Sequence, residues 1–371
     1  MANKQLTVLQ LLPALEGGGV ERGTLEVARA LVQAGHRSLV MSAGGRHVEQ
    51  LIAEGSEHIA WEIGRKHLAT LLLIRPLRRL LEKEQVNIVH VRSRLPAWIL
   101  EFALRGLSAD RRPVRVSTVH GLYSVSRYSA IMTRGERVIA VSNTVHDYIL
   151  KHYPECPPER IVVIPRGVDP KEFPRGYQPV TAWREAFFGQ FPQTRDKTLL
   201  TLPGRLTRLK GHHEFIALIE ALVHRGMPVH GLIVGGEDPR RAAYAREIRE
   251  AVAQRGLQEH VTFTGARSDM RDLYAISRIV FSLSTKPESF GRTVAEALSI
   301  GTPVIGYDHG GVGEILAQWF PEGRTPLADQ RALTEVSIRL ISKSPAVPRN
   351  DDFTLKKMLD RTLALYAKVS S

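Results

Sequence analysis

Short apolar runs alternate with longer amphipathic segments along almost the whole chain. Most of the apolar runs, such as residues 6–12, lack the polar and apolar alternation of a strand with one face in water. An amphipathic segment between two runs, such as residues 24–34, is typical of a helix that crosses from one parallel strand to the next. The pattern therefore predicts an α/β fold with doubly wound parallel sheets.

The alternation occurs in two blocks. In the first block we expect strands at residues 6–12, 38–41, 86–91, 114–119, 138–141 and 161–164. In the second block we expect strands at residues 198–202, 231–234, 261–263, 279–283 and 303–306, and helices at 214–224, 240–255, 269–276 and 293–300. A chain of 371 residues is too long for one ordinary domain, so we interpret each block as one domain.

A stretch rich in proline and glycine, residues 166–192, separates the blocks, and we interpret it as an interdomain linker. We place the first domain at residues 1–175 and the second at residues 176–353. The last segment spaces four apolar residues along one helix face, Leu355, Leu359, Leu363 and Tyr366. We therefore expect a helix at 354–371 that packs on an apolar surface.

The chain is strongly basic, with 51 Lys and Arg against 38 Asp and Glu, a formal charge of +13. Through residue 175 these numbers are 25 and 17, a net +8. This excess indicates an anionic partner: phosphates, nucleic acid or an acidic membrane face. Arginine is dense in the first block, at Arg75, Arg78, Arg79, Arg92, Arg94, Arg111, Arg112 and Arg115. Our hypothesis is a partner molecule that is itself anionic or anchored in an acidic membrane, and a merely soluble basic face is the alternative.

The single cysteine, Cys156, cannot form a disulfide within the chain. We therefore expect a reducing, cytoplasmic setting. From the basic charge we also expect the protein to be peripheral at the inner face of the plasma membrane. No apolar run, the segment 68–74 included, approaches the roughly 20 residues that a spanning helix needs.

Ligands of open parallel sheets bind beyond the carboxyl ends of the strands, and four segments follow strands in this way. The first, residues 16–23, contains Gly18 and Gly19, which let backbone N–H groups approach a phosphate at the start of a helix. A tight turn without a ligand is the alternative. Arg22 stands at the position of the third glycine of the dinucleotide fingerprint, which disfavours a nicotinamide cofactor.

The second segment, residues 203–211, places Arg205 and Lys210 between glycines. An arginine can bind two oxygens and a lysine supplies a point charge, so this pair suits a diphosphate. A solvated basic loop is the alternative.

The third segment, residues 286–298, holds Glu288 and Glu296 with seven residues between them. Eight steps of ideal helix advance about 12 Å, which is the order of the distance from a sugar ring across a diphosphate to a ribose. Two glutamates on a surface helix are the alternative.

The fourth segment, residues 307–314, is a glycine-rich turn that opens a helix, and it is either a substrate loop or a structural turn. In the first block, His120 follows a strand directly. A structural histidine in the core or at its rim is the default interpretation of that residue.

Taken in order, these motifs resemble those of the retaining glycosyltransferases of family 4, which have the GT-B fold. The resemblance depends on Gly-Gly-x-Glu at residues 18–21, Gly-Arg-x4-Lys-Gly at 204–211, the pair Glu288 and Glu296, and the Gly-Gly-x-x-Glu turn that ends at Glu314. It implies two Rossmann-like domains that face each other across a cleft, with the last helix packed back on the first domain. The second domain would hold a nucleoside diphosphate sugar and the first the acceptor.

The resemblance also implies roles for single residues. Arg205 and Lys210 would grip the diphosphate and stabilise the departing nucleotide, and His120 would lie near the transferred sugar. The other donor contacts would come from Gly18, Gly19, Arg267, Glu288, Phe290, Gly291, Arg292, Thr293 and Glu296. Glu288 would bind sugar hydroxyls and Glu296 the ribose. Arg166 and Arg278 depart from the family pattern, which leaves the base unassigned.

The chemistry implied is a front-face displacement that keeps the anomeric configuration. No Asp-x-Asp pair occurs in the sequence, so we expect the cations to replace a divalent metal. No cofactor is expected beyond the donor substrate, for which a UDP-sugar is favoured.

The expected function is transfer of a hexose to a glycan or lipid-linked acceptor in cell-envelope biosynthesis, such as that of a lipopolysaccharide core. A nucleotide-sugar 2-epimerase or a phosphorylase of the same fold is the enzymatic alternative. A nucleic-acid-binding protein is disfavoured because the sequence lacks interleaved aromatic and basic residues and any zinc or helix-turn-helix signature.

Overall fold

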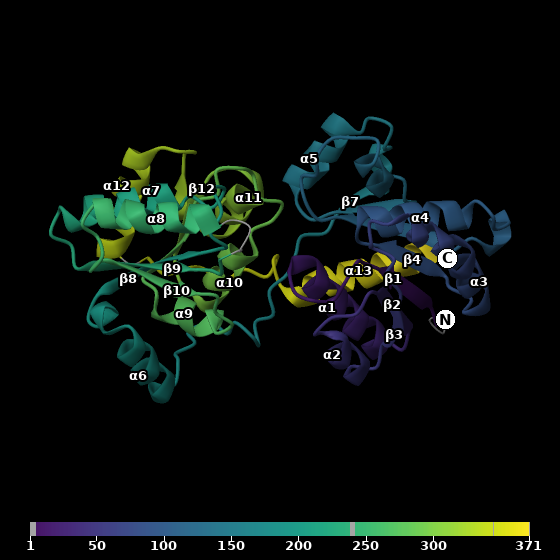
Figure 1. Ribbon diagram of the computed structural model, residues 1–371, viewed down its shortest axis with the longest axis horizontal. Coiled ribbons are helices and arrows are strands. Elements are labelled where there is room, and N and C mark those ends of the chain that lie inside the picture. Colours follow the sequence, from purple (N-terminus) through teal and green to yellow (C-terminus); the bar gives the residue numbers. More distant parts are fainter. Residues whose placement is uncertain (1–4, 238–241, 344, 371) are drawn as a thin grey trace. The chain divides into compact units, whose positions relative to one another are not determined.

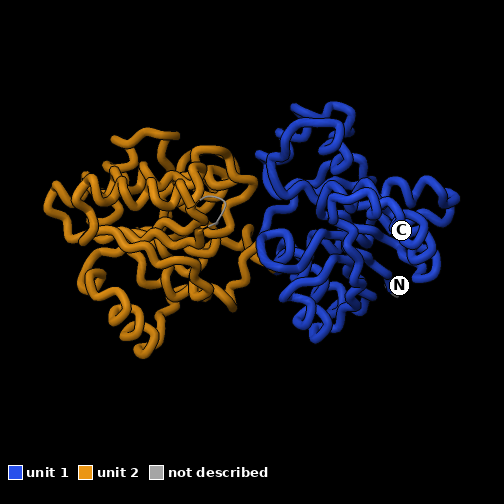
Figure 2. The backbone as a smooth tube through the Cα atoms, viewed as in Figure 1, with its two compact units in different colours: residues 1–166, 356–371 blue, residues 167–355 orange. Residues whose placement is uncertain are grey.

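The computed structural model describes residues 5–237, 242–343 and 345–370. The chain divides into two compact units, residues 1–166 with 356–371 and residues 167–355 (Figure 2). Each unit contains one sheet of parallel strands with helices on both of its faces (Figure 1). This architecture confirms the predicted α/β class with two Rossmann-like domains.

The first sheet has seven strands in the order β3-β2-β1-β4-β5-β6-β7. Their bounds are β1 Thr7–Leu11, β2 Arg37–Ser42, β3 Glu57–Ala60, β4 Ile88–Val91, β5 Val114–Val119, β6 Arg137–Ala140 and β7 Ile161–Val163. The helices of this part are α1 Gly19–Gln33, α2 Val48–Ala53, α3 Ile74–Lys83, α4 Arg94–Leu104 and α5 Asn143–His152. Strand β3 was not predicted, because it is an edge strand whose side chains are exposed or half-buried.

The second sheet has six strands in the order β10-β9-β8-β11-β12-β13. Their bounds are β8 Thr198–Pro203, β9 Val229–Val234, β10 Val261–Gly265, β11 Ile279–Ser282, β12 Val304–Tyr307 and β13 Arg324–Thr325. The helices are α6 Thr181–Gln190, α7 His212–Val223, α8 Ala242–Gln254, α9 Met270–Ile276, α10 Arg292–Ile300, α11 Gly310–Trp319 and α12 Gln330–Lys343. Residues 240 and 241 of the helix expected at 240–255 lie outside the described residues.

The interpretation of residues 166–192 as a linker is wrong for most of their length. Val168 donates a backbone hydrogen bond to Phe353 O (2.8 Å) and accepts one from Leu355 N (2.8 Å), so the segment that starts at residue 167 belongs to the second unit. Residues 181–190 form helix α6, and the side chain of its Phe187 is buried in an apolar cluster. The unit boundary therefore lies nine residues before the expected one.

The chain ends in helix α13, Leu355–Ser370, and residues 356–371 belong to the first unit. The buried face of this helix consists of Met358, Thr362, Leu365 and Tyr366. Of the four residues expected on it, Tyr366 is buried, whereas Leu355, Leu359 and Leu363 are half-buried. Within the described ranges, no helix is both long enough and apolar enough to span a membrane.

Candidate active site

Strands β8 and β11 are neighbours in the centre of the second sheet, although β9 and β10 separate them in the chain. The sheet is built outward from β8 in one direction and from β11 in the other. The carboxyl ends of these two strands therefore flank a topological switch point, where open parallel sheets bind ligands. The loop after β8, residues 204–211, contains most of the second predicted motif, and the loop after β11, residues 283–291, contains the first part of the third.

Gly211 allows the loop after β8 to reach the end of β11. It has φ +72°, and a Cβ atom at this position would lie 2.1 Å from the carbonyl oxygen of Leu283. The amide of Thr285 also donates a hydrogen bond to Leu209 O (2.9 Å). The two loops are thus joined through their backbones, directly beside Lys210.

The glycine-rich turn after β12 packs on the loop after β11. The amide of Gly311 donates a hydrogen bond to the carbonyl oxygen of Glu288 (2.8 Å). A Cβ atom on Gly311 would lie 2.4 Å from Phe290 Cα, so only glycine permits this approach. The fourth predicted motif therefore supports the backbone that carries Glu288.

At the centre of these loops, Lys210 Nζ lies 2.6 Å from Glu288 Oε1. The Ser284 hydroxyl donates a hydrogen bond to the same carboxylate oxygen, and His309 Nε2 lies 2.7 Å from Ser284 O. The side chains of Lys210 and Glu288 are 31% and 25% exposed, so both reach solvent. A ligand can therefore contact both charged groups.

The ionisation of Glu288 is controlled by these neighbours. Burial raises the pKa of its carboxyl, but the charge of Lys210 and the hydrogen bonds from Lys210 and Ser284 outweigh that effect. The net result is a pKa below the ordinary value, so Glu288 is a carboxylate at neutral pH. An anionic acceptor of hydrogen bonds suits the hydroxyl groups of a sugar.

Arg205 lies in the same loop as Lys210 and its side chain is exposed. Within the part of the chain that the structure describes, it makes no hydrogen bond or ion pair. Since Glu288 offsets only the charge of Lys210, the loop presents one uncompensated cation at the switch point. This arrangement can bind a polyanion such as a diphosphate.

Helix α10 begins at Arg292, after Gly291 with φ +117°. Residues 288–291 are not helical, so the estimate of about 12 Å from eight helical steps does not apply to Glu288 and Glu296. Glu296 is 6% exposed and accepts a hydrogen bond from the Tyr274 hydroxyl (3.2 Å). The first amides of the helix, those of Arg292 and Thr293, stand at the positive end of its dipole.

Among the described residues, no contact links Arg267 to Lys210 or Glu288. It follows β10, which β9 separates from β8. Its Nε atom donates a hydrogen bond to Asp269 (2.8 Å), and its guanidinium lies 5.9 Å from the Phe187 ring of α6. Its place beside the base therefore stays a prediction.

Two predicted features lie in the first unit. Gly18 and Gly19 are exposed at the start of α1. His120 follows β5, and the Arg166 guanidinium contacts its Nδ1 atom. Burial, together with the charges of Arg166 and Arg92, holds the pKa of His120 well below its ordinary value. The imidazole is therefore neutral at pH 7.

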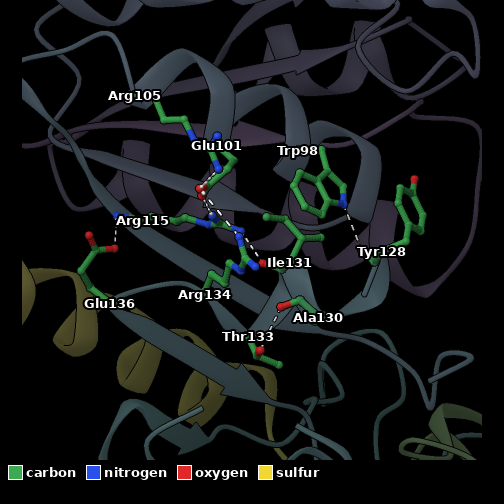
Figure 3. A network of polar contacts seen from close by, with 10 residues as sticks. All are labelled: Trp98, Glu101, Arg105, Arg115, Tyr128, Ala130, Ile131, Thr133, Arg134 and Glu136. Atoms are coloured by element: carbon green, nitrogen blue, oxygen red, sulfur yellow. Dashed lines mark hydrogen bonds and ion pairs between the residues drawn. The ribbon is translucent and has the colours of Figure 1, made fainter. Parts of the chain in front are cut away.

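The dense arginines of the first unit are not one free basic face. Arg92 and Arg115 are each only 2% exposed. Figure 3 shows Glu101 among three guanidinium groups, those of Arg105 at 3.3 Å, Arg115 at 3.0 Å and Arg134 at 3.9 Å. Four others of the eight also have partners: Arg78 with Ala103 O, Arg94 with the Ser129 hydroxyl, Arg111 with Glu82 and Arg112 with Leu107 O.

Sequence reasoning did not assign roles to Ser284 and His309, which complete the network around Glu288. Ser284 is a polar residue two positions after the buried strand β11, and His309 lies inside the fourth predicted motif. Both residues lie in loops that follow strands, which is the same signal that points to Arg205 and Lys210. Their connection to Glu288 depends on how the loops pack, which the motifs alone do not specify.

Comparison with known proteins is consistent with this geometry. Residues 17–172 match the family model described as Glycosyltransferase Family 4, and residues 184–349 match the model described as Glycosyl transferases group 1. Alpha-maltose-1-phosphate synthase of Mycolicibacterium smegmatis is 26% identical over 287 residues, which is 70% of each chain. Mannosylfructose-phosphate synthase of Agrobacterium fabrum is 32% identical over 173 residues, which is 45% of this chain and 36% of that protein.

Solved structures share the fold over nearly the whole chain. A glycosyltransferase from Rickettsia africae has a TM-score of 0.86 and 29% identity, and the match covers 98% of each chain. Anabaena Alr3699/HepE in complex with UDP and glucose has a TM-score of 0.79 and 19% identity, with 98% of this chain and 100% of that chain covered.

Proposed function

The chain belongs to the glycosyltransferases of family 4 and group 1, and from this premise we propose that it transfers a hexose from a nucleoside diphosphate sugar to an anionic acceptor. The observation that carries the proposal is the ion pair of Lys210 and Glu288 at the switch point of the second sheet, with the exposed Arg205 in the same loop as Lys210. Two cations and one carboxylate match the diphosphate and the hydroxyl groups of such a donor.

The ammonium group of Lys210 donates a hydrogen bond to Glu288 at the switch point. We propose that a bound diphosphate contacts Lys210 and Arg205, while the carboxylate of Glu288 accepts hydrogen bonds from the hydroxyl groups of the sugar. As the bond between the sugar and the diphosphate breaks, negative charge grows on the leaving phosphate. Cations that are already in place stabilise that charge without reorganisation.

His120 has a defined hydrogen-bonding role in this scheme. Because Arg166 donates to its Nδ1 atom, the proton of the neutral ring is assigned to Nε2. The residue is then a hydrogen-bond donor and not a general base. We propose that this N–H group serves the transferred sugar in a front-face displacement that keeps the anomeric configuration and needs no protein nucleophile.

A UDP-sugar is the proposed donor, since a structural neighbour, Anabaena Alr3699/HepE, was solved with UDP and glucose. The names of two relatives, alpha-maltose-1-phosphate synthase and mannosylfructose-phosphate synthase, specify phosphorylated products. Together with the basic first unit, they support an acceptor that carries a phosphate or a similar anion. We propose that this acceptor is a glycan or lipid-linked molecule of the cell envelope, used at an anionic membrane surface inside the cell.

Thermal unfolding in the presence of UDP, GDP, ADP and their sugars tests donor binding. A ligand at about 100 times its dissociation constant adds roughly 2.7 kcal/mol to the free energy of unfolding. Glu288→Ala is expected to keep the stabilisation by the nucleotide and to lose the additional effect of its sugar. Failure of every nucleotide to stabilise the protein would contradict the proposal.

Transfer kinetics test the role of the cations. Lys210→Ala is expected to slow transfer by about 100-fold or more, because one preorganised contact to the leaving group is lost. Arg208→Ala is the matched control, since Arg208 lies in the same loop and its exposed side chain pairs with Glu247. Equal rates for both variants would show that the site is assigned wrongly. Conversion of the donor without any acceptor would instead indicate an epimerase.

A further inference from the structure

One turn of the first unit exposes three leucines to solvent. Leu68, Leu71 and Leu72 are 82%, 48% and 76% exposed and lie in the 3-10 helix Leu68–Leu73. Within the ranges that the structure describes, nine large hydrophobic residues are exposed, so this turn holds a third of them. A contiguous apolar group of this kind marks an interaction surface, whereas single exposed leucines do not.

The turn is anchored on its inner side. The buried Thr70 hydroxyl donates a hydrogen bond to Arg65 O (2.7 Å), and His67 Nδ1 accepts one from the Ala69 amide (3.1 Å). Leu77 and Leu81 of the following helix α3 are buried in the core. The fold therefore holds the three leucines outward.

Cations flank the leucines on both sides in the chain. Arg65, Lys66, Arg75 and Arg79 are all exposed. Arg65 pairs with Glu62 at 2.6 Å, but Lys66, Arg75 and Arg79 form no ion pair with any residue that the structure describes. Most of the eight dense arginines have protein partners, whereas Arg75 and Arg79 keep their charge available beside the apolar turn.

From this combination we infer that residues 65–79 are the segment by which the protein docks on an anionic lipid bilayer. The leucines enter the boundary of the acyl region, and the cations remain at the level of the headgroups. A second copy of the chain fits less well, because a two-fold contact through this surface would bring like charges together. The inference rests on the proposed membrane location and does not depend on the donor.

Vesicle flotation tests the inference with the full chain. The probes are vesicles of phosphatidylcholine with and without phosphatidylglycerol. We expect binding only to the anionic vesicles, and a loss of about tenfold or more in the partition coefficient for Leu68→Ser/Leu71→Ser/Leu72→Ser. Ile52→Ser and Val180→Ser, which remove hydrophobic groups that are 55% and 67% exposed elsewhere, are the controls and should bind as the parent does.

A second variant separates charge from apolar contact. Lys66→Gln/Arg75→Gln/Arg79→Gln is expected to lose most of the preference for anionic vesicles and most of the salt dependence of binding. Unchanged nucleotide binding and an unchanged thermal midpoint would show that either triple variant is folded.

The outcomes distinguish the inference from the proposals on which it rests. Equal binding of the parent and the leucine variant to anionic vesicles would contradict the assignment of residues 65–79 as the docking segment, but not the proposed membrane location. A parent that binds neither vesicle type would overturn both and leave sugar transfer untouched. A parent that is dimeric in sedimentation, with a monomeric leucine variant, would assign the surface to a second copy of the chain and overturn the inference.

Discussion

The hydroxyl oxygen of Tyr366 lies 2.5 Å from Nδ1 of His90, so that the last helix of the chain is bonded to the central strand of the first sheet. Tyr366 is 0% and His90 1% exposed. Burial holds the pKa of His90 well below its ordinary value, and its Nε2 atom lies 2.6 Å from the Thr118 hydroxyl. The neutral ring thus bonds through both nitrogens.

Replacement of Tyr366 by phenylalanine removes one of these bonds and leaves a buried nitrogen without its partner. We expect the free energy of unfolding to fall by about 1–3 kcal/mol, measured by urea denaturation. Tyr128→Phe makes the same chemical change at a side chain that is 40% exposed, and about 0.5 kcal/mol or less is expected there. Equal losses in the two variants would show that the bond to His90 contributes nothing specific.

Gly211→Ala should impair both stability and transfer. The residue has φ +72°, and a Cβ atom would meet Leu283 O at 2.1 Å. Gly226 has φ +73° with open space around it, so Gly226→Ala reports the backbone strain alone, about 1 kcal/mol. Gly211→Ala should cost more in urea denaturation and should slow transfer by about tenfold or more, because Lys210 moves with the loop. Similar stability and rates for the two variants would refute this account of the loop.

The sequence predicts most strands of both sheets because buried parallel strands appear as apolar runs. The prediction fails where the local composition does not reveal which residues are buried in an element. Strand β3 is an edge strand with exposed residues, and helix α6 lies within a stretch that proline and glycine mark as a linker.

The candidate site was predictable to a similar degree. Arg205, Lys210 and Glu288 could be found because they follow strands beside glycines. The bonds of Ser284 and His309 depend on loops that lie far apart in the chain and meet only in the fold. Composition also cannot distinguish the buried Arg115 from the exposed Arg75.

The ion pair of Glu288 should make stability depend on pH in the acid range. The folded pKa of Glu288 lies below the ordinary value of 4.5, because Lys210 and Ser284 outweigh the effect of burial. Its contribution is therefore complete above pH 4.5 and is lost as the pH falls through the folded pKa. The difference in thermal midpoint between the parent and Glu288→Gln should be largest at neutral pH and should shrink in acid.

Glu335→Gln provides the control for that measurement, since its ion pair with Arg331 is exposed and should add little at any pH. A gap between the parent and Glu288→Gln that stays constant from neutral pH into the acid range would contradict the assigned ionisation.

A second pH effect is expected from His230 in strand β9. Burial, with small additions from His260 and Lys197, lowers its pKa from 6.5 to about 4. The unfolded chain takes up this proton near pH 6.5 and the folded chain near pH 4, so stability decreases as the pH falls between these values and levels off below them. The decrease is on the order of 3 kcal/mol.

His230→Gln should flatten this part of the profile, measured by urea denaturation at each pH, since its amide can still bond Thr262. His224→Gln, at an exposed position, should leave the profile as it is. A parent profile that His230→Gln does not change would assign the pH dependence to other groups.

Glu101 should contribute to stability through the buried member of its three ion pairs. Arg115 is 2% exposed and burial lowers its pKa, so a nearby carboxylate is needed to offset the cost of burying its charge. Glu101→Gln is expected to lower the free energy of unfolding by about 3 kcal/mol. Arg105→Ala breaks an exposed pair to the same carboxylate and should cost about 1 kcal/mol or less. If the loss comes from an uncompensated buried charge, the double variant Glu101→Gln/Arg115→Met should recover part of the lost free energy of unfolding in urea denaturation. A further loss in the double variant would show that Arg115 acts mainly through its hydrogen bond to Ile131 O.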